Sequence, residues 1–203
     1  MDEGRRERKK RESRRHIADV ATGLFVRHGF EQVTIAEVAE AAEVSKKTVS
    51  NYFARKEDLF FDRQEDILRA ISDALRARPD GEPVSAALRR YQHRLLAERH
   101  PTSGVFAGID GFLWVIRQSP ALTARALELD HEIEDLIREV LLEEGADRAH
   151  ARIVAGLLSS ALTSISKHSQ QRILDGDDLQ DVQRAHPAVI DAAFDLVEGG
   201  IAR

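Results

Sequence analysis

Helical spacing of apolar residues runs through nearly the whole chain and constrains its fold more than any other feature. Between Lys10 and His28, apolar residues stand at i, i+3, i+4, i+7 and i+8 counted from Ile17. Gly29 then occupies the place of a left-handed C-terminal cap. We find no convincing run of alternating polar and apolar residues, the pattern of a half-buried β-strand. The sequence therefore predicts an all-α protein of about nine helices.

The expected helices are separated by turn-forming stretches, of which "ARPDGEP" at residues 77–83 is the clearest. The stretch "DGDDLQDVQRAHP" is expected to separate the last two helices. The approximate helix positions are 10–28, from Thr34, from Ser45, 57–78, 83–99, 104–118, 121–144, 147–174 and 187–199. The first three helices are expected to form a compact head, and the others a larger bundle.

Composition excludes several classes of protein. Hydrophobic residues make up 42% of the 203 residues, enough for a buried core. The absence of cysteine excludes a disulfide framework and thiolate zinc modules. No apolar run approaches the roughly 20 residues of a membrane helix, and Asp19 interrupts any signal-peptide apolar region. We expect a cytoplasmic protein with no membrane partner.

Charge is distributed unevenly along the chain. Residues 1–56 carry 13 Lys and Arg against 9 Asp and Glu, whereas the remaining residues carry 17 against 26. A basic segment joined to an acidic one indicates that only the basic segment meets a polyanion. A solvated basic tail without a partner is the alternative that charge alone leaves open.

The stretch "TIAEVAEAAEVSKKTVSNYF" predicts a helix-turn-helix motif. Thr34 and Glu37 have the spacing of a capping box at the start of one short helix, and Ser45 caps the next. Val49 and Phe53 are expected to face inward, so the second helix presents a polar outer side that fits the DNA major groove. The outer residues are Lys46, Lys47, Thr48, Ser50, Asn51 and Tyr52. A helical hairpin with a solvated polar face is the alternative.

These residues also carry a family resemblance. Over roughly residues 15–62 the chain resembles the DNA-binding domain of the TetR family of bacterial transcriptional regulators. The matching positions are Leu24-Phe25, Gly29-Phe30, Thr34-Ile35, Val38-Ala39, Ala42, Val44-Ser45, Thr48, Tyr52-Phe53, Lys56-Glu57 and Leu59. Glu43 stands where the family usually has glycine, and a positive φ there would cost about 1 kcal/mol. Lys47 and Ser50 also depart from the usual pattern, so the resemblance implies the docking mode but not the bases read.

The resemblance implies three groups of DNA-binding residues. They are Thr34 and Lys56 at phosphates; Ser45, Lys46, Thr48 and Tyr52 positioning the reading helix; and Lys47, Ser50 and Asn51 at base edges. The arm "RRERKKRESRR" at residues 5–15 could lie along the backbone or reach into a minor groove. Disorder with only non-specific attraction is the alternative for the arm.

The helices expected at about 147–174 and 187–199 are apolar on more than one side, so they need partners on more than one side. A chain with one helix-turn-helix usually dimerises to read two half-sites, and the resemblance implies a homodimer through these two helices. Part of each apolar stripe belongs to the intrachain core. The resemblance also implies a small-molecule pocket, for which an ordinary core is the alternative. Its candidate residues are Tyr91, Phe106, Ile109, Asp110, Phe112, Leu113, Trp114 and Arg117.

An enzyme or metal protein is the rival class. Glu128 and His131 have the Glu-x-x-His spacing of di-iron bundles, but His131 lies nearly opposite the apolar face of its helix. Neither a phosphate loop nor a nucleophile motif is present, so we expect no catalysis, no metal and no cofactor. A non-specific nucleoid DNA-binding protein is a further alternative.

The sequence thus predicts a homodimeric transcriptional regulator, most simply a repressor that a small-molecule effector releases from a pseudo-palindromic operator in double-stranded DNA. Residues 1–56 would form the basic arm and the DNA-binding domain, and residues 57–203 a helical ligand-binding and dimerisation domain.

Overall fold

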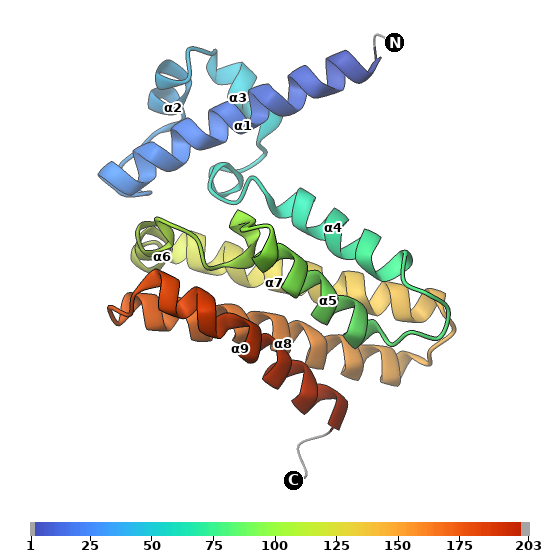
Figure 1. Cartoon of the computed structure of the whole chain (residues 1–203). Helices are drawn as coiled ribbons and strands as arrows, with labels where there is room; N and C mark the ends of the chain where they lie inside the picture. The colour runs from blue at the N-terminus through green and yellow to red at the C-terminus, as the bar shows by residue number, and fades with distance from the viewer. Residues whose placement is uncertain (1–2, 200–203) are drawn as a thin grey trace. The chain divides into compact units, whose positions relative to one another are not determined.

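In the computed structural model, which describes residues 3–199, every regular element is helical, so the all-α prediction is confirmed (Figure 1). The elements are α1 (Glu3–His28), α2 (Ile35–Ala41), α3 (Lys46–Tyr52), η1 (Glu57–Leu59), α4 (Gln64–Arg76), α5 (Val84–Ala97), η2 (Pro101–Ser103), α6 (Ile109–Gln118), α7 (Pro120–Glu143), α8 (Arg148–Leu174) and α9 (Leu179–Gly199). None of these helices is both long and apolar enough to cross a membrane, as judged over the described part of the chain.

The chain divides into two compact units. The head unit comprises the residues up to Gln64 together with Gly111–Arg125. The body unit comprises Glu65–Asp110 and the residues from Ala126 onward. Helices α6 and α7 therefore each contribute residues to both units.

One face of α1 forms the centre of the head unit. Ile17, Ala21 and Phe25, spaced four residues apart, are fully buried. The ring of Phe25 lies 4.9 Å from that of Phe30. Further buried members of the same core come from α2, α3, η1 and the first turns of α7: Val38, Ala39, Val49, Leu59 and Leu122. Burial of this face holds the two short helices α2 and α3, which are too short to be stable alone.

The prediction of one continuous helix over residues 57–78 is wrong. The segment forms the short turn η1 and then α4, which begins only at Gln64. Leu59 and Phe60 are both buried, and Phe61 packs edge-on against Phe60. A continuous helix cannot turn three consecutive apolar side chains toward one core, so the chain leaves the helical path between them.

The body unit is a bundle whose helices share one apolar core. Its largest fully buried side chains are Ile71, Leu75, Leu88, Ile137, Leu158, Ile165, Ile190 and Phe194. Helices α5 and α8 both pack against α9.

Two expected helix starts in this bundle are corrected. Helix α6 begins at Ile109 and not near residue 104, because Gly104 and Gly108 adopt φ values of +77° and +86°, which end a helix. Helix α9 begins at Leu179, and Pro187 lies inside it. Its buried residues Val182, His186, Ile190 and Phe194 recur every four residues on both sides of the proline, so packing carries the helix through it.

Candidate nucleic-acid interface

Helix α2 begins with the capping box that the sequence predicts. The Thr34 hydroxyl accepts a hydrogen bond from the backbone N–H of Glu37 at 3.2 Å, and the Thr34 N–H donates to the Glu37 carboxylate at 2.7 Å. The backbone N–H of Thr34, followed by its hydroxyl, holds the pKa of the Glu37 carboxyl below its usual value. Two backbone donors are thereby satisfied reciprocally.

The turn between α2 and α3 passes through Glu43 with a φ of +54°. The following residue, Val44, donates its N–H to the carbonyl of Ala39 at 2.9 Å and so closes the end of α2. Non-glycine residues rarely adopt this left-handed conformation. The strain foreseen at the glycine position of the family is therefore present in this chain.

Helix α3 is fixed at its N-terminus by Ser45 and along its inner side by Val49 and Phe53. The Ser45 hydroxyl accepts from the backbone N–H of Thr48 at 3.0 Å and lies 2.8 Å from the Thr48 hydroxyl. Val49 and Phe53 are buried, as predicted. The same arrangement leaves four side chains exposed and two half-buried: Lys46, Lys47, Ser50 and Asn51, and Thr48 and Tyr52.

A contact that the sequence analysis missed holds the C-terminal end of α3. The Arg14 guanidinium donates to the backbone carbonyl of Tyr52 and lies 4.5 Å from the ring centre of Phe53. Arg14 is one helical turn before Ile17, the first buried residue of α1. That phase was visible in the sequence and would have separated Arg14 from the rest of the basic arm.

Lys56 is turned inward. Its ammonium donates to the carbonyl of Phe30 and lies 4.2 Å from the ring centre of Phe30 and 5.7 Å from that of Phe25. Burial lowers the pKa of Lys56, because the charged form loses solvation, although Glu31 acts in the opposite direction. In this conformation Lys56 joins the segment after α3 to the loop after α1.

Two further contacts tie the corner between α6 and α7 into the head unit. The Ser119 hydroxyl donates to the Glu31 carboxylate at 2.6 Å, and Arg125 Nε lies 3.2 Å from Asp58 Oδ1. In addition, Phe112 stacks on Phe60 with 4.2 Å between ring centres. These partners are far apart in sequence, and no local pattern pointed to them.

The eight candidate effector residues are divided between the two units. In the body unit Tyr91 and Ile109 are buried, Phe106 is half-buried and Asp110 is exposed. Burial raises the pKa of Tyr91. In the head unit Phe112 and Leu113 are half-buried, and Trp114 and Arg117 are exposed.

A cavity of about 510 Å³ lies elsewhere in the body unit, at the turn between α4 and α5. It is lined in part by Arg78, Glu82 and Glu144, and Arg78 is already bonded to both Glu144 and the carbonyl of Glu82. The charged side chains that line it are therefore already paired with one another.

Within the part of the chain that the structure describes, no group of three or more His, Asp or Glu side chains could hold a metal ion. His131 is exposed, with Nδ1 2.7 Å from the Leu127 carbonyl.

Comparison with known proteins agrees with this geometry. Residues 17–62 match the model of the bacterial regulatory proteins of the tetR family. The chain is 33% identical over 151 residues to the HTH-type transcriptional regulator TcmR of Streptomyces glaucescens, a match that covers 71% of this chain and 66% of TcmR, just under two thirds of that relative.

Solved structures share the fold at low sequence identity. NalD, the secondary repressor of the MexAB-OprM multidrug efflux pump in Pseudomonas aeruginosa, aligns with a TM-score of 0.59 at 14% identity over 91% of this chain and 96% of NalD. A SmeT–triclosan complex aligns with a TM-score of 0.58 at 15% identity over 90% of each chain. The capped helix-turn-helix and the matching family model together show that residues 17–62 belong to the TetR family of bacterial regulatory proteins.

Proposed function

We propose that this protein is a sequence-specific DNA-binding transcriptional regulator, a repressor that a small-molecule effector releases from its operator. The observation that carries the proposal is the outer side of α3, where Lys46, Lys47, Ser50 and Asn51 are exposed while Val49 and Phe53 anchor the helix from within. A helix of this kind fits the major groove, where its side chains reach base edges and phosphates.

The proposed DNA contacts fall into two classes. Exposed Lys47, Ser50 and Asn51 would read base edges, since amide and hydroxyl groups hydrogen-bond to bases. The proposed phosphate-contacting and positioning residues are Thr34, Ser45, Lys46, Thr48, Tyr52 and Lys56. Lys56 can contact a phosphate only if it breaks its hydrogen bond to the Phe30 carbonyl. We therefore expect it to contribute less to DNA affinity than the other residues of this class.

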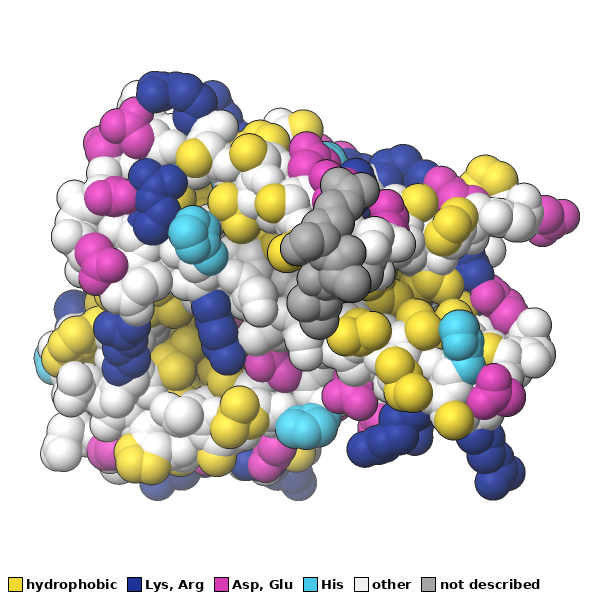
Figure 2. All heavy atoms as spheres, turned by 90° about the horizontal axis from the view of Figure 1, so that it is seen from below, with side chains coloured by type: hydrophobic (Ala, Val, Ile, Leu, Met, Phe, Trp, Pro, Cys, Tyr) yellow, Lys and Arg dark blue, Asp and Glu magenta, His cyan; other side chains and the backbone are white. Residues whose placement is uncertain are grey.

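Dimerisation through α8 and α9, within the ranges 147–174 and 187–199, is part of the proposal. Ile153 and Leu157 in α8 are 62% and 47% exposed, and Leu196 in α9 is 62% exposed. Hydrophobic side chains are spread over the face of the molecule in Figure 2. Ile153 and Leu157 stand one helical turn apart on α8, and an exposed apolar patch marks a surface that a partner covers. Two copies would place their reading helices in half-sites about 34–36 Å apart.

The effector is proposed to bind the part of the chain after residue 56, with DNA binding assigned to residues 1–56. Support comes from the SmeT structure, which holds triclosan in a chain of the same fold. The candidate contacts within the body unit are Tyr91, Phe106, Ile109 and Asp110. Release requires that the effector prefer the conformation that does not bind DNA, because equal affinity for both conformations shifts nothing.

Selection of DNA duplexes from a random pool tests the central claim. We expect the purified protein to enrich a pseudo-palindrome that it binds roughly 10³-fold or more above random DNA. Binding without any preferred sequence would instead indicate a non-specific nucleoid protein. Mass measurement of the complex should give two protein chains on each pseudo-palindrome.

A further inference from the structure

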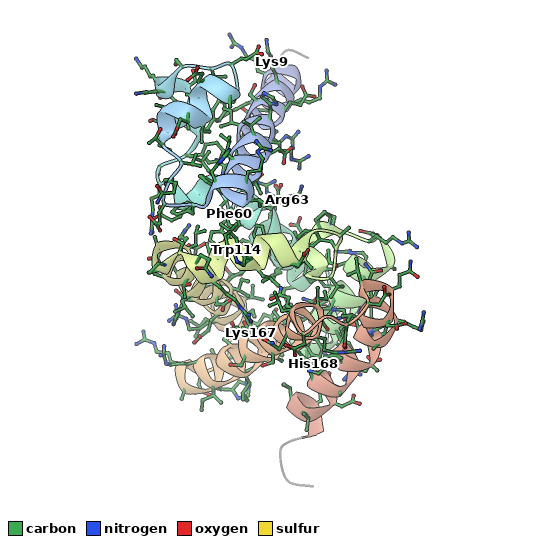
Figure 3. The ribbon with its side chains drawn as sticks, turned by 90° about the vertical axis from the view of Figure 1, so that its left-hand side faces the viewer. Lys9, Phe60, Arg63, Trp114, Lys167 and His168 are labelled. Carbon is green, nitrogen blue, oxygen red and sulfur yellow. The ribbon has the colours of Figure 1, made fainter. Side chains whose placement is uncertain are left out.

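Helix α1 extends well beyond the part of it that is buried. The helix runs from Glu3 to His28, but its first buried residue is Ile17. Residues 6–12 are exposed around the whole circumference of the helix. Figure 1 shows this end of α1 projecting past α3, and Figure 3 shows Lys9 near its tip. The predicted arm is therefore a helical continuation of the core helix.

The projecting segment is strongly basic. Residues 5–15, called the basic extension below, contain eight Lys and Arg against two Glu. Because residues 6–12 are exposed, their charges face water and not a packed neighbour. The pair between Arg8 and Glu12, 3.7 Å apart and about two thirds exposed, is a weak surface ion pair.

Several like charges of the basic extension repel one another in the helical form. Like charges stand four residues apart at Arg6 and Lys10, at Lys10 and Arg14, and at Arg11 and Arg15. Such pairs destabilise a helix by about 0.2–0.5 kcal/mol each. Helical turns without tertiary contacts are marginal in water. A polyanion beside the segment would reduce this repulsion and so stabilise the helix. In solvent alone the repulsion between these side chains remains.

Arg14 sets the direction in which the basic extension faces. It contacts the last carbonyl of α3, so its side of α1 is turned toward the C-terminal end of the reading helix. Lys10 and Arg11 precede Arg14 by four and three residues and lie on the same side of α1, one turn further out. The basic side of the extension thus continues the surface that begins at α3.

We propose that the basic extension is a second DNA-binding surface, which contacts backbone phosphates flanking the bases that α3 reads. This inference rests on the proposed DNA-binding function. Eleven helical residues span about 16 Å, which matches about five base pairs at 3.4 Å per phosphate along one strand. The contacts carry no base preference, because lysine and arginine at phosphates position a protein without reading sequence.

The test compares two triple variants on two DNA duplexes. Lys9→Ala, Lys10→Ala and Arg11→Ala together remove three charges from the extension while keeping a good helix former at each position. The matched control removes three exposed arginines of the body unit: Arg69→Ala, Arg99→Ala and Arg184→Ala. One duplex is the selected pseudo-palindrome alone, and the other adds eight base pairs of arbitrary sequence on each side. Circular dichroism melting verifies that both variants are folded.

The wild type and the body-unit control should bind the flanked duplex about tenfold more tightly than the short one at low salt. The extension variant should lose this gain. Its plot of log affinity against log salt should be shallower by about 0.9 for each phosphate that the variant no longer neutralises. Its preference for the pseudo-palindrome over a scrambled core should be unchanged, since α3 is intact.

Several outcomes would overturn the proposal. An extension variant that keeps the full gain from the flanks excludes the basic extension as a contact surface. Equal losses in both variants would show an effect of net charge alone. A gain that depends on the A·T content of the flanks would indicate minor-groove reading in place of phosphate contact. Failure of the wild type to select any sequence would instead refute the proposed function itself.

Discussion

Arg14 of α1 donates a hydrogen bond to the backbone carbonyl of Tyr52, the last residue of α3, although the two residues are 38 positions apart. The same guanidinium covers the ring of Phe53. One side chain from outside the helix-turn-helix thus satisfies the carbonyl end of the proposed reading helix. The orientation of α3 therefore depends on α1 as well as on its own caps.

Arg14→Ala should lower the free energy of unfolding by about 1–2 kcal/mol, because a carbonyl at a helix end loses a charged donor. Arg14→Lys should recover only part of this loss, since an ammonium cannot stack flat on Phe53. Urea unfolding measures both effects. Arg11→Ala removes the same charge one turn earlier, at an exposed position, and an equal loss there would contradict the assigned contact.

Glu43→Gly should raise the free energy of unfolding by about 1 kcal/mol, because glycine adopts the φ of +54° without the steric cost that a β-carbon brings. Glu40→Gly is the matched control inside α2. The control should lose about 1 kcal/mol, since glycine is a poor residue within a helix. Thermal melting of the two variants should therefore shift in opposite directions, and a shared direction would show that Glu43 is not strained.

Lys46→Ala and Asn51→Ala should weaken DNA binding in different ways. Loss of Lys46 should lower affinity for all duplexes alike and reduce the salt slope by about one. Loss of Asn51 should cost about 1–3 kcal/mol on the preferred sequence and relax discrimination at one or two base positions. Titrations on the selected pseudo-palindrome and its single-base variants distinguish the two. If both variants lost the same affinity for every duplex, the assignment of different roles to Lys46 and Asn51 would be wrong.

His186 should make the stability of the protein depend on pH. The ring is buried, with Nδ1 2.7 Å from the Ser169 hydroxyl, and burial together with nearby His168 and His93 lowers the pKa of His186 from 6.5 to about 4. Between about pH 4 and 6.5, His186 is therefore protonated in the unfolded chain and neutral in the folded protein. The contribution of neutral His186 to the free energy of unfolding should be fully present above about pH 6.5. The free energy of unfolding should then fall by up to about 3 kcal/mol as the pH drops toward 4.

Urea unfolding between pH 4 and 7 measures this dependence in the wild type and in His186→Gln, which cannot titrate. The variant is less stable at neutral pH, but its pH slope should be flatter than that of the wild type. His16→Gln, at an exposed position of the head unit, should keep the wild-type slope. A slope that survives the loss of His186 would assign the dependence to other groups.

The helix-turn-helix was legible in the sequence because its interactions are short-range. The capping box joins Thr34 to Glu37, and the cap of α3 joins Ser45 to Thr48. Val49 and Phe53 stand one helical turn apart, so the buried side of α3 followed from spacing alone. Interactions within four residues depend little on the rest of the fold, which is why these expectations hold in the structure.

The start of α9 and the break before α4 were misjudged for the opposite reason. Polar turn-forming residues before Pro187 favoured a loop, yet packing of Val182 and His186 in the core keeps that segment helical. The run from Leu59 to Phe61 looked compatible with one helix, yet its three consecutive side chains all pack on the core of the head unit. In both places tertiary burial outweighs local preference, which is worth about 1 kcal/mol or less per residue apart from proline.

The sequence by itself determined the helical class, the position of the helix-turn-helix, the caps of α2 and α3 and the polar side that α3 presents, because each depends on neighbours within one or two turns. Only the tertiary structure decided that Arg14 holds the end of α3, that Lys56 turns back to Phe30 and that Phe112 stacks on Phe60. These partners are separated by 38, 26 and 52 positions. Pairings at such distances are selected by the shape and burial of the completed core, which no local pattern of residues encodes.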